Sequence, residues 1–244
     1  MMTDRTTARV VGSLFIVASV AGAVGLAIQQ PVLDSSEYLT EAALKENRVA
    51  TGALLELIMG VAVVGIAIAI YPVLRRRSER LALGYVAART IEAVIYVIGS
   101  IVLLTLLTVS REFVDAGAPD ASHFQTLGGL LLAVRDWGGH GVLDAAVFSL
   151  GALILNYALY RARLVPGWLS VWGLAGASLY LAAGVLVIYG LEPLSTTQVV
   201  LEVPLGVQEM VLAVWLIVKG FDAPASASGP GKEPAPAQRQ GVLT

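Results

Sequence analysis

The alternation of hydrophobic and polar positions divides this chain into six long apolar segments joined by short polar ones. A helix needs about 20 mostly apolar residues to cross the hydrocarbon core of a bilayer, and each of the six segments approaches or exceeds that length. The pattern predicts an all-α fold, a polytopic integral membrane protein whose six-helix bundle occupies residues 1–221. The six expected spans are residues 10–28, 49–74, 81–109, 142–160, 168–190 and 199–221.

Two shorter helices are expected beside the spans. Residues 35–47 read as a short outer helix, with Ser35 or Ser36 as its N-cap. Phe124–Trp137 is apolar but too short to cross, and segments of about 10–14 residues are more often interfacial or re-entrant. The glycines of Gly138–Gly141 predict a chain break between this helix and the fourth span. Whether the helix re-enters the membrane or lies on its surface stays open.

The placement of lysine and arginine predicts that both termini are cytoplasmic. Cytoplasmic loops of membrane proteins carry an excess of these residues. With the N-terminus inside, the inner segments hold Arg5, Arg9, Arg75, Arg76, Arg77, Arg80, Arg161, Arg163, Lys219, Lys232 and Arg239. The outer segments hold only Lys45, Arg48 and Arg111. The first apolar run is longer than the about 7–15 residues of a signal peptide, so we expect a retained helix. Residues 222–244, rich in Ala, Pro, Ser and Gly, predict a disordered cytoplasmic tail.

Composition agrees with a membrane protein and narrows its chemistry. Hydrophobic residues make up 57% of the 244 and charged residues only 14%, whereas soluble domains have about 45–50% and 25%. A net charge of −2 gives no basic surface for nucleic acid. There is no cysteine and there are only two histidines, so we expect no metal and no cofactor. No nucleophile elbow, zinc-protease motif or phosphate loop occurs, and we therefore expect no enzyme.

Three charged residues lie deep inside predicted spans. Tyr85, Arg89, Glu92 and Tyr96 follow one another at intervals of four, three and four, which places them on one helix face. Glu209 lies near the middle of the sixth span. A central charge costs roughly 2.5–3.5 kcal/mol on insertion scales, so such residues usually face the bundle interior and serve a function. An Arg89–Glu92 pair that only neutralises itself is the simpler alternative.

Further polar residues lie toward the outer side. Glu202 shares a helix face with Glu209, seven residues on, and Glu56 lies deep in an apolar stretch. For Asp144 the favoured interpretation is electrostatic stabilisation near a helix N-terminus. Arg135 and Asp136 end the short apolar run, and we expect Arg135 to reach the outer mouth of the bundle. His140, within the glycine segment, is expected to be a polar cap.

The acids outnumber the bases in this set, which favours a proton or a small cationic solute over an anion. Six acids (Glu56, Glu92, Asp136, Asp144, Glu202 and Glu209) stand against Arg89 and Arg135. In this hypothesis Glu92 and Glu209 bind the cation, Arg89 is their counter-ion, and Glu56, Arg135 and Asp136 form an outer gate. Two alternatives remain: a structural or stress-related membrane protein whose ionic cluster fixes helix packing, and a lipid-modifying enzyme using His140, Asp136 and Arg135.

The chain also resembles a bacterial family of multi-pass membrane proteins defined by a domain of unknown function, number 4386. The resemblance runs from about Thr6 to Phe221 and is carried by short strings at Gly52–Met59, Tyr71–Arg75, Leu131–Trp137, Leu164–Gly173 and Gln208–Met210. It implies a multi-pass location in the bacterial inner membrane and no catalytic residues. The expected partners are the lipid bilayer and the proton or cation, and a homo-oligomer is compatible with the sequence.

Overall fold

The structure, a computed structural model, describes residues 4–116 and 121–222, and these residues form helices and short connections without strands. Of the tail predicted for residues 222–244, all but Asp222 lies outside the described residues. The helices are α1 (Asp4–Leu33), α2 (Tyr38–Leu44), α3 (Glu46–Arg75), α4 (Glu79–Ala116), α5 (Ala121–Asp136), the π-helix η2 (Trp137–Phe148), α6 (Ser149–Ala162), α7 (Gly167–Ile188) and α8 (Thr196–Val218).

The prediction of six membrane-spanning helices is confirmed. Six helices of the described chain are long and apolar enough to cross a membrane: α1, α3, α4, the continuous helix Ser122–Ala162, α7 and α8. Their lengths differ, because α7 has 22 residues whereas α4 has 38 and the fourth span has 41. At 1.5 Å per residue the two longest helices exceed a hydrocarbon core of about 30 Å by a wide margin. Part of each therefore projects from the membrane.

The expected chain break before the fourth span is wrong. Phe124–Trp137 is the outer part of one continuous helix in which α5 passes through η2 into α6. Gly138, Gly139 and Gly141 lie within the π-helix. The physical reason is that a backbone at membrane depth must satisfy its hydrogen bonds within the helix, so glycines there loosen the winding without ending it.

The short outer helix is present, but its expected cap is wrong. Helix α2 begins at Tyr38, and no side chain caps it. The Ser35 hydroxyl instead accepts a hydrogen bond from the Glu37 backbone N–H, 3.2 Å away, in the turn before the helix. The helix packs mainly on α4, where Leu39 and Ala42 join a buried cluster with Leu103 and Leu106.

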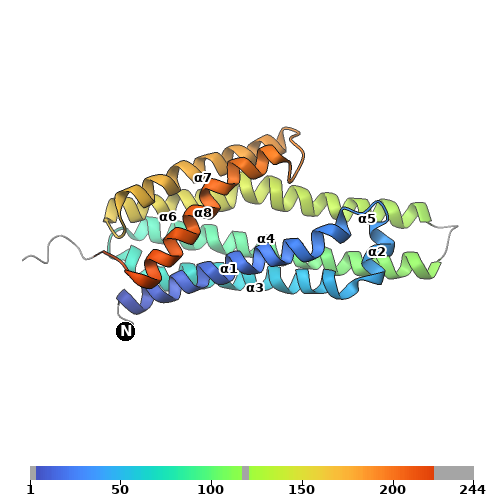
Figure 1. The fold of residues 1–244 in the computed structure, drawn as a ribbon, viewed down its shortest axis with the longest axis horizontal. Coiled ribbons are helices and arrows are strands. Elements are labelled where there is room, and N and C mark those ends of the chain that lie inside the picture. The colour runs from blue at the N-terminus through green and yellow to red at the C-terminus, as the bar shows by residue number, and fades with distance from the viewer. Residues whose placement is uncertain (1–3, 117–120, 223–244) are drawn as a thin grey trace, which may run out of the picture.

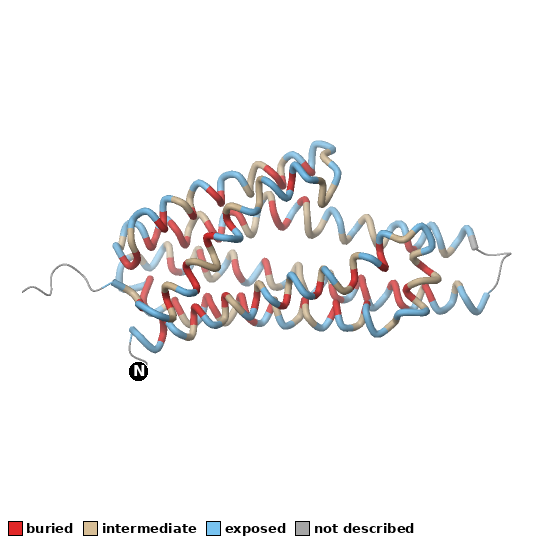
Figure 2. The backbone as a smooth tube through the Cα atoms, in the orientation of Figure 1, coloured by how far each residue is buried: buried red, intermediate tan, exposed pale blue. Residues whose placement is uncertain are grey.

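The six spans run roughly along the long axis of the molecule (Figure 1). Their mutual contacts close them into a ring. Helix α1 packs on α3, α3 on α4, α4 on the fourth span, the fourth span on α7, α7 on α8, and α8 on α1. In the described part of the chain, spans that are not neighbours in this order barely approach each other along their backbones. Buried positions follow the inward faces of the helices, and exposed positions follow the outer faces (Figure 2). Such a ring encloses an interior that side chains must fill.

One end of the ring is closed by an apolar core. Both described chain ends lie there, since the Asp222 backbone N–H bonds the Leu164 carbonyl, 2.8 Å away, and Arg76 pairs with Asp4. The core at this end combines residues of all six spans, among them Val11, Phe15, Ile70, Tyr85, Leu159, Leu169 and Leu216. That this end faces the cytoplasm stays a prediction. The interior is therefore sealed at the end that carries the termini.

Candidate functional site

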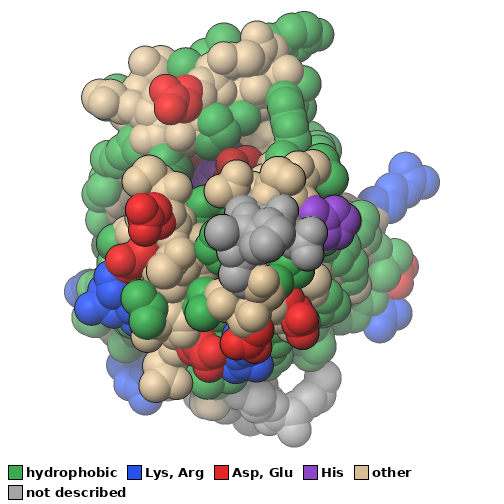
Figure 3. All heavy atoms as spheres, turned by 90° about the vertical axis from the view of Figure 1, so that its right-hand side faces the viewer, with side chains coloured by type: hydrophobic (Ala, Val, Ile, Leu, Met, Phe, Trp, Pro, Cys, Tyr) green, Lys and Arg blue, Asp and Glu red, His purple; other side chains and the backbone are tan. Residues whose placement is uncertain are grey.

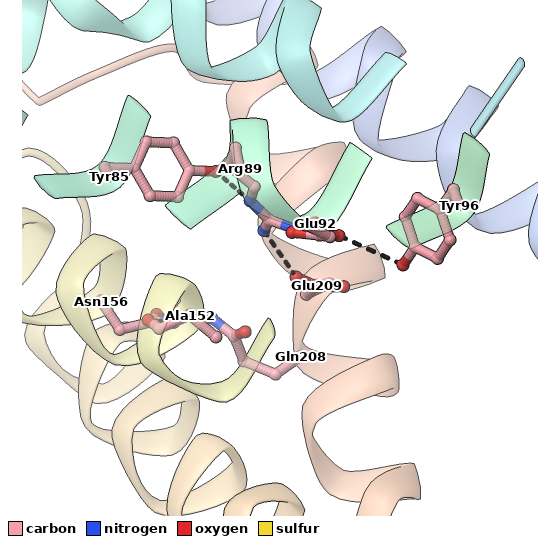
Figure 4. A network of polar contacts seen from close by, with 8 residues as sticks. All are labelled: Tyr85, Arg89, Glu92, Tyr96, Ala152, Asn156, Gln208 and Glu209. Carbon is pink, nitrogen blue, oxygen red and sulfur yellow. Dashed lines mark hydrogen bonds and ion pairs between the residues drawn. The ribbon is translucent and has the colours of Figure 1, made fainter. Parts of the chain in front are cut away.

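The charged residues predicted on one face of the third span form one network inside the ring (Figure 4). Arg89 Nη1 donates to both carboxylate oxygens of Glu92, at 2.8 and 3.0 Å. Its Nε donates to the Tyr85 hydroxyl at 3.0 Å, and its Nη2 reaches Glu209 on α8 at 3.5 Å. The Tyr96 hydroxyl completes the network by donating to Glu92 at 3.2 Å. The predicted meeting of Arg89, Glu92 and Glu209 therefore occurs.

Burial divides this network into a sealed part and an accessible part. The side chains of Arg89 and Glu92 are 1% and 0% exposed, whereas that of Glu209 is 12% exposed. Three aromatic rings surround the guanidinium, with centroids 5.3–5.9 Å from its central carbon, and they belong to Tyr85, Phe15 and Phe148. Cation–π contacts of this kind stabilise a desolvated arginine. Arg89 and Glu92 are thus fixed, and Glu209 is the member that faces open space.

A second ion pair lies nearer the outer end. Arg135 on α5 donates to Glu56 on α3 at 2.6 Å, and the amide of Gln29 on α1 donates to the same carboxylate oxygen at 3.0 Å. The side chains of Arg135 and Glu56 are 15% and 11% exposed. Two members of the predicted outer gate therefore meet, in a pair whose charges cancel.

A third polar group consists of two carboxylates that share one amide. Gln198 Nε2 on α8 donates to Asp144 of η2 at 3.3 Å and to Glu202 at 2.7 Å. The Gln198 oxygen accepts the Leu194 backbone N–H at 2.7 Å, which orients the nitrogen toward the acids. His140 lies 3.8 Å from Asp144. Within residues 4–116 and 121–222, no lysine or arginine forms an ion pair with either acid.

Two adjoining cavities connect these groups. The inner cavity, of 210 Å³, is lined by residues of all six spans, including Arg89, Glu92 and Glu209. The outer cavity, of 280 Å³, is lined by the two remaining groups, including Glu56, Arg135, His140 and Glu202. Five residues line both cavities, namely Gly22, Met59, Tyr96, Asp144 and Tyr180. Figure 3 shows the end of the molecule farther from the termini, where acidic and histidine side chains are visible in a recess.

Not every predicted residue belongs to these cavities. Asp136 lines a separate cavity of 300 Å³ with Trp137 and Glu192, beside the α7–α8 connection, so it does not join the Glu56–Arg135 pair. Gln208 also turns away from its neighbour Glu209, because its amide bonds Asn156 of α6 at 3.1 Å and the Leu169 carbonyl at 3.2 Å. Of the three residues predicted to form an outer gate, Glu56 and Arg135 therefore lie together and Asp136 lies apart from them.

Sequence reasoning missed the central position of Asp144 and the role of Gln198. The sequence favours a position near a helix N-terminus for Asp144, but the fourth helix begins much farther out, so Asp144 lies in its middle. A usable signal existed for Gln198, because Gln198, Glu202 and Glu209 follow at intervals of four and seven on one face of α8. No cluster of three or more metal-ligating side chains occurs among residues 4–116 and 121–222.

The fold and this interior define a multi-pass helical membrane protein with an acidic polar centre. Residues 10–220 match the model of the family described as Domain of unknown function (DUF4386), and the chain belongs to that family. This bears out the resemblance found in its sequence strings. Neither a curated protein nor a solved structure matches the chain.

Proposed function

We propose that this protein binds a proton or a small cationic solute in the interior of its helix ring and moves it along the ring axis. The observation that carries the proposal is the pair of carboxylates held by one amide, the buried Asp144 and the half-buried Glu202, with no described lysine or arginine paired to either. Two adjacent carboxylates in a low dielectric do not both stay charged without a counter-charge. A proton or a cation supplies that charge.

The arrangement of the cavities supports movement as well as binding. Asp144 lines both cavities, with Glu202 in the outer one and Glu209 in the inner one. A cation that enters from the outer end therefore meets three carboxylates in succession along the axis. Beyond Glu209 the apolar core closes the path. The structure corresponds in this proposal to a state that is open outward and closed inward, as alternating access requires.

The test is a flux assay on purified protein reconstituted into liposomes that contain a pH-sensitive dye, with a potassium diffusion potential as the driving force. We expect acidification of the lumen by the wild-type protein and a loss of at least tenfold in Glu202→Gln. Glu192→Gln, an exposed glutamate of the α7–α8 connection, is the matched control and keeps the wild-type rate. Wild-type liposomes with neither proton flux nor uptake of a labelled cation would refute the proposal.

A second candidate, a structural protein whose ionic cluster fixes helix packing, is favoured by one observation. Arg89 and Glu92 are almost completely enclosed and surrounded by aromatic rings, as in a permanent packing element. In that case joint replacement of Arg89 and Glu209 by apolar residues leaves a folded protein and an unaffected cell. If transport occurs, the same double variant folds but carries no cation, so the flux assay separates the two candidates.

A further inference from the structure

The outer cavity is lined largely by apolar and aromatic side chains, which a binding site for an inorganic ion does not require. Besides its acids it is lined by apolar side chains, among them Leu26, Met59, Ile95 and Val134, and by the rings of Tyr96 and Tyr180. Pockets for small organic ligands have this character, with mostly apolar walls and a few placed polar groups. Its 280 Å³ also exceeds the ~30 Å³ share of a single water molecule by far.

Polar groups at the junction of the two cavities are incompletely paired within the described part of the chain. Asp144 is 5% exposed. One of its oxygens accepts the Gln198 amide, its carboxyl group lies within hydrogen-bonding reach of that of Glu202, and no described lysine or arginine pairs with it. The Tyr180 hydroxyl makes no hydrogen bond within the described chain, although its ring packs on Phe148 with centroids 4.8 Å apart. Inside a membrane bundle such groups need a donor or acceptor from elsewhere.

The charges around the outer cavity favour a positive occupant. Arg135 is neutralised by Glu56 at 2.6 Å, and Arg89 is enclosed behind Glu92. The remaining charges are those of Asp144 and Glu202, with His140 Nδ1 3.8 Å from the Asp144 carboxylate. Aromatic faces attract cations, and ammonium groups in particular bind between aromatic rings. Small inorganic cations such as Ca²⁺ instead require about 6–8 oxygen ligands at close range.

We infer that the outer cavity is a binding site for a small organic ammonium ion. Its charged nitrogen lies at the junction, against Asp144 and Glu202 and between the rings of Tyr96 and Tyr180. Its apolar body lies against Leu26, Met59 and the other apolar walls of the outer cavity. The inference rests on the proposed function and specifies the cationic solute in it, with N–H donors that the adjacent carboxyl groups of Asp144 and Glu202 accept.

The probe is n-butylammonium chloride, added to the purified full-length protein in detergent. Unfolding is followed by the intrinsic fluorescence of its four tryptophans. A ligand that binds only the folded state raises the melting temperature in proportion to its occupancy. We expect a saturable rise with n-butylammonium, and none with 1-butanol or with sodium chloride at equal concentration. An equal effect of 1-butanol or sodium chloride overturns the inference.

Variants locate the binding. Glu202→Gln should weaken the apparent affinity for n-butylammonium at least tenfold, and Asp144→Asn provides the same test should Glu202→Gln fold poorly. Glu192→Gln, outside the cavity, should bind as the wild type does. Binding that survives both Glu202→Gln and Asp144→Asn also overturns the site.

The flux assay distinguishes a failure of this inference from a failure of the proposed function. One outcome is proton flux that n-butylammonium does not inhibit, with no uptake of n-butylammonium and no shift in melting temperature. That outcome refutes the ammonium site and leaves the proposed function intact. Saturable binding that depends on Glu202, without any flux, retains the site and removes transport.

Discussion

At the scale of single residues, the same type of ion pair occurs in two very different environments. Arg89 and Glu92 are joined at 2.8 Å with 1% and 0% of their side chains exposed, and Arg111 and Glu46 are joined at 2.6 Å with 56% and 38% exposed. Water and salt screen the second pair, so its contribution to stability is small. The first pair has no water to replace a lost partner. Its two members therefore depend on each other.

The first prediction concerns this buried pair. Arg89→Met leaves the Glu92 carboxylate buried without its partner, and we expect the free energy of unfolding to fall by about 3–5 kcal/mol. The double variant Arg89→Met/Glu92→Leu removes the unpaired charge as well and should recover most of that loss. Chemical denaturation in mixed micelles measures both. Arg111→Met is the control, with an expected loss of about 1 kcal/mol or less. Equal losses in Arg89→Met and Arg111→Met would contradict the prediction.

Much of this network could be predicted from the sequence, and the reason is local. Tyr85, Arg89, Glu92 and Tyr96 share one helix face by spacing alone, and the hydrogen bonds between them confirm it. The partner Glu209 could be anticipated only from its similar depth in another span. The Glu202–Asp144 group is harder to predict, because its two acids lie on different helices and the bridging residue, Gln198, is uncharged, although its spacing places it on the same face of α8 as Glu202.

At the scale of elements, the π-helix η2 is what carries Asp144 into the interior. A π-turn places more residues in each turn than an α-turn and rotates the faces that follow. The Ser149 hydroxyl donates to the Asp144 carbonyl five residues earlier, within this winding. Gly184 of α7 lies against the η2 backbone, so closely that a Cβ added to Gly184 would overlap the Ala145 backbone nitrogen. The position of Asp144 thus depends on a glycine in another helix.

The second prediction tests that dependence. Gly184→Ala forces α7 and η2 apart, and overpacking of this kind costs about 1–3 kcal/mol, so the melting temperature should fall. The displaced Asp144 should also reduce cation flux in the liposome assay. Gly206→Ala is the matched control, since no atom lies within 4 Å of a Cβ there, and it should leave both quantities near wild type. The prediction fails if the two variants behave alike.

Sequence patterns predicted the existence of the helices better than their continuity. The six apolar runs are all spans, because hydropathy over about 20 residues reflects a strong physical requirement of the bilayer. The glycines at 138, 139 and 141 predict a break by a rule that holds for helices in water. In a membrane bundle the alternative to a helix is an unbonded backbone, so the helix continues and changes its winding instead.

At the scale of the whole molecule, the ring is held together across its interior by polar pairs. Arg89 joins α4 to α8, Arg135 joins α5 to α3, and Gln198 joins α8 to η2. Each of these pairs connects spans that are not neighbours in the ring. No sequence pattern announces a ring, because neighbour order follows from which helix faces fit together. Once the ring exists, however, inward-facing polar residues have only its interior in which to meet.

The third prediction concerns the orientation of the ring in the membrane. The termini end carries Arg5, Arg9, Arg161 and Arg163, and the positive-inside rule therefore places it in the cytoplasm. The chain has no cysteine, so single cysteines introduced into it can be labelled without a background. Glu79 and Glu192 are both exposed, and they lie at opposite ends of the ring. Glu79 begins α4 at the termini end, and Glu192 lies in the α7–α8 connection at the other end, so the two positions form a matched pair of labelling sites.

In intact bacterial cells, a membrane-impermeant maleimide should label Glu192→Cys and leave Glu79→Cys unlabelled until the cells are opened. The expectation follows because segments with clustered arginines are rarely carried across the membrane during insertion. The end without the termini has few basic residues and can be carried across. The reverse labelling would place the open end of the acidic cavities in the cytoplasm. A cation would then be collected from inside the cell, and the driving force for its movement through Glu202, Asp144 and Glu209 would change sign.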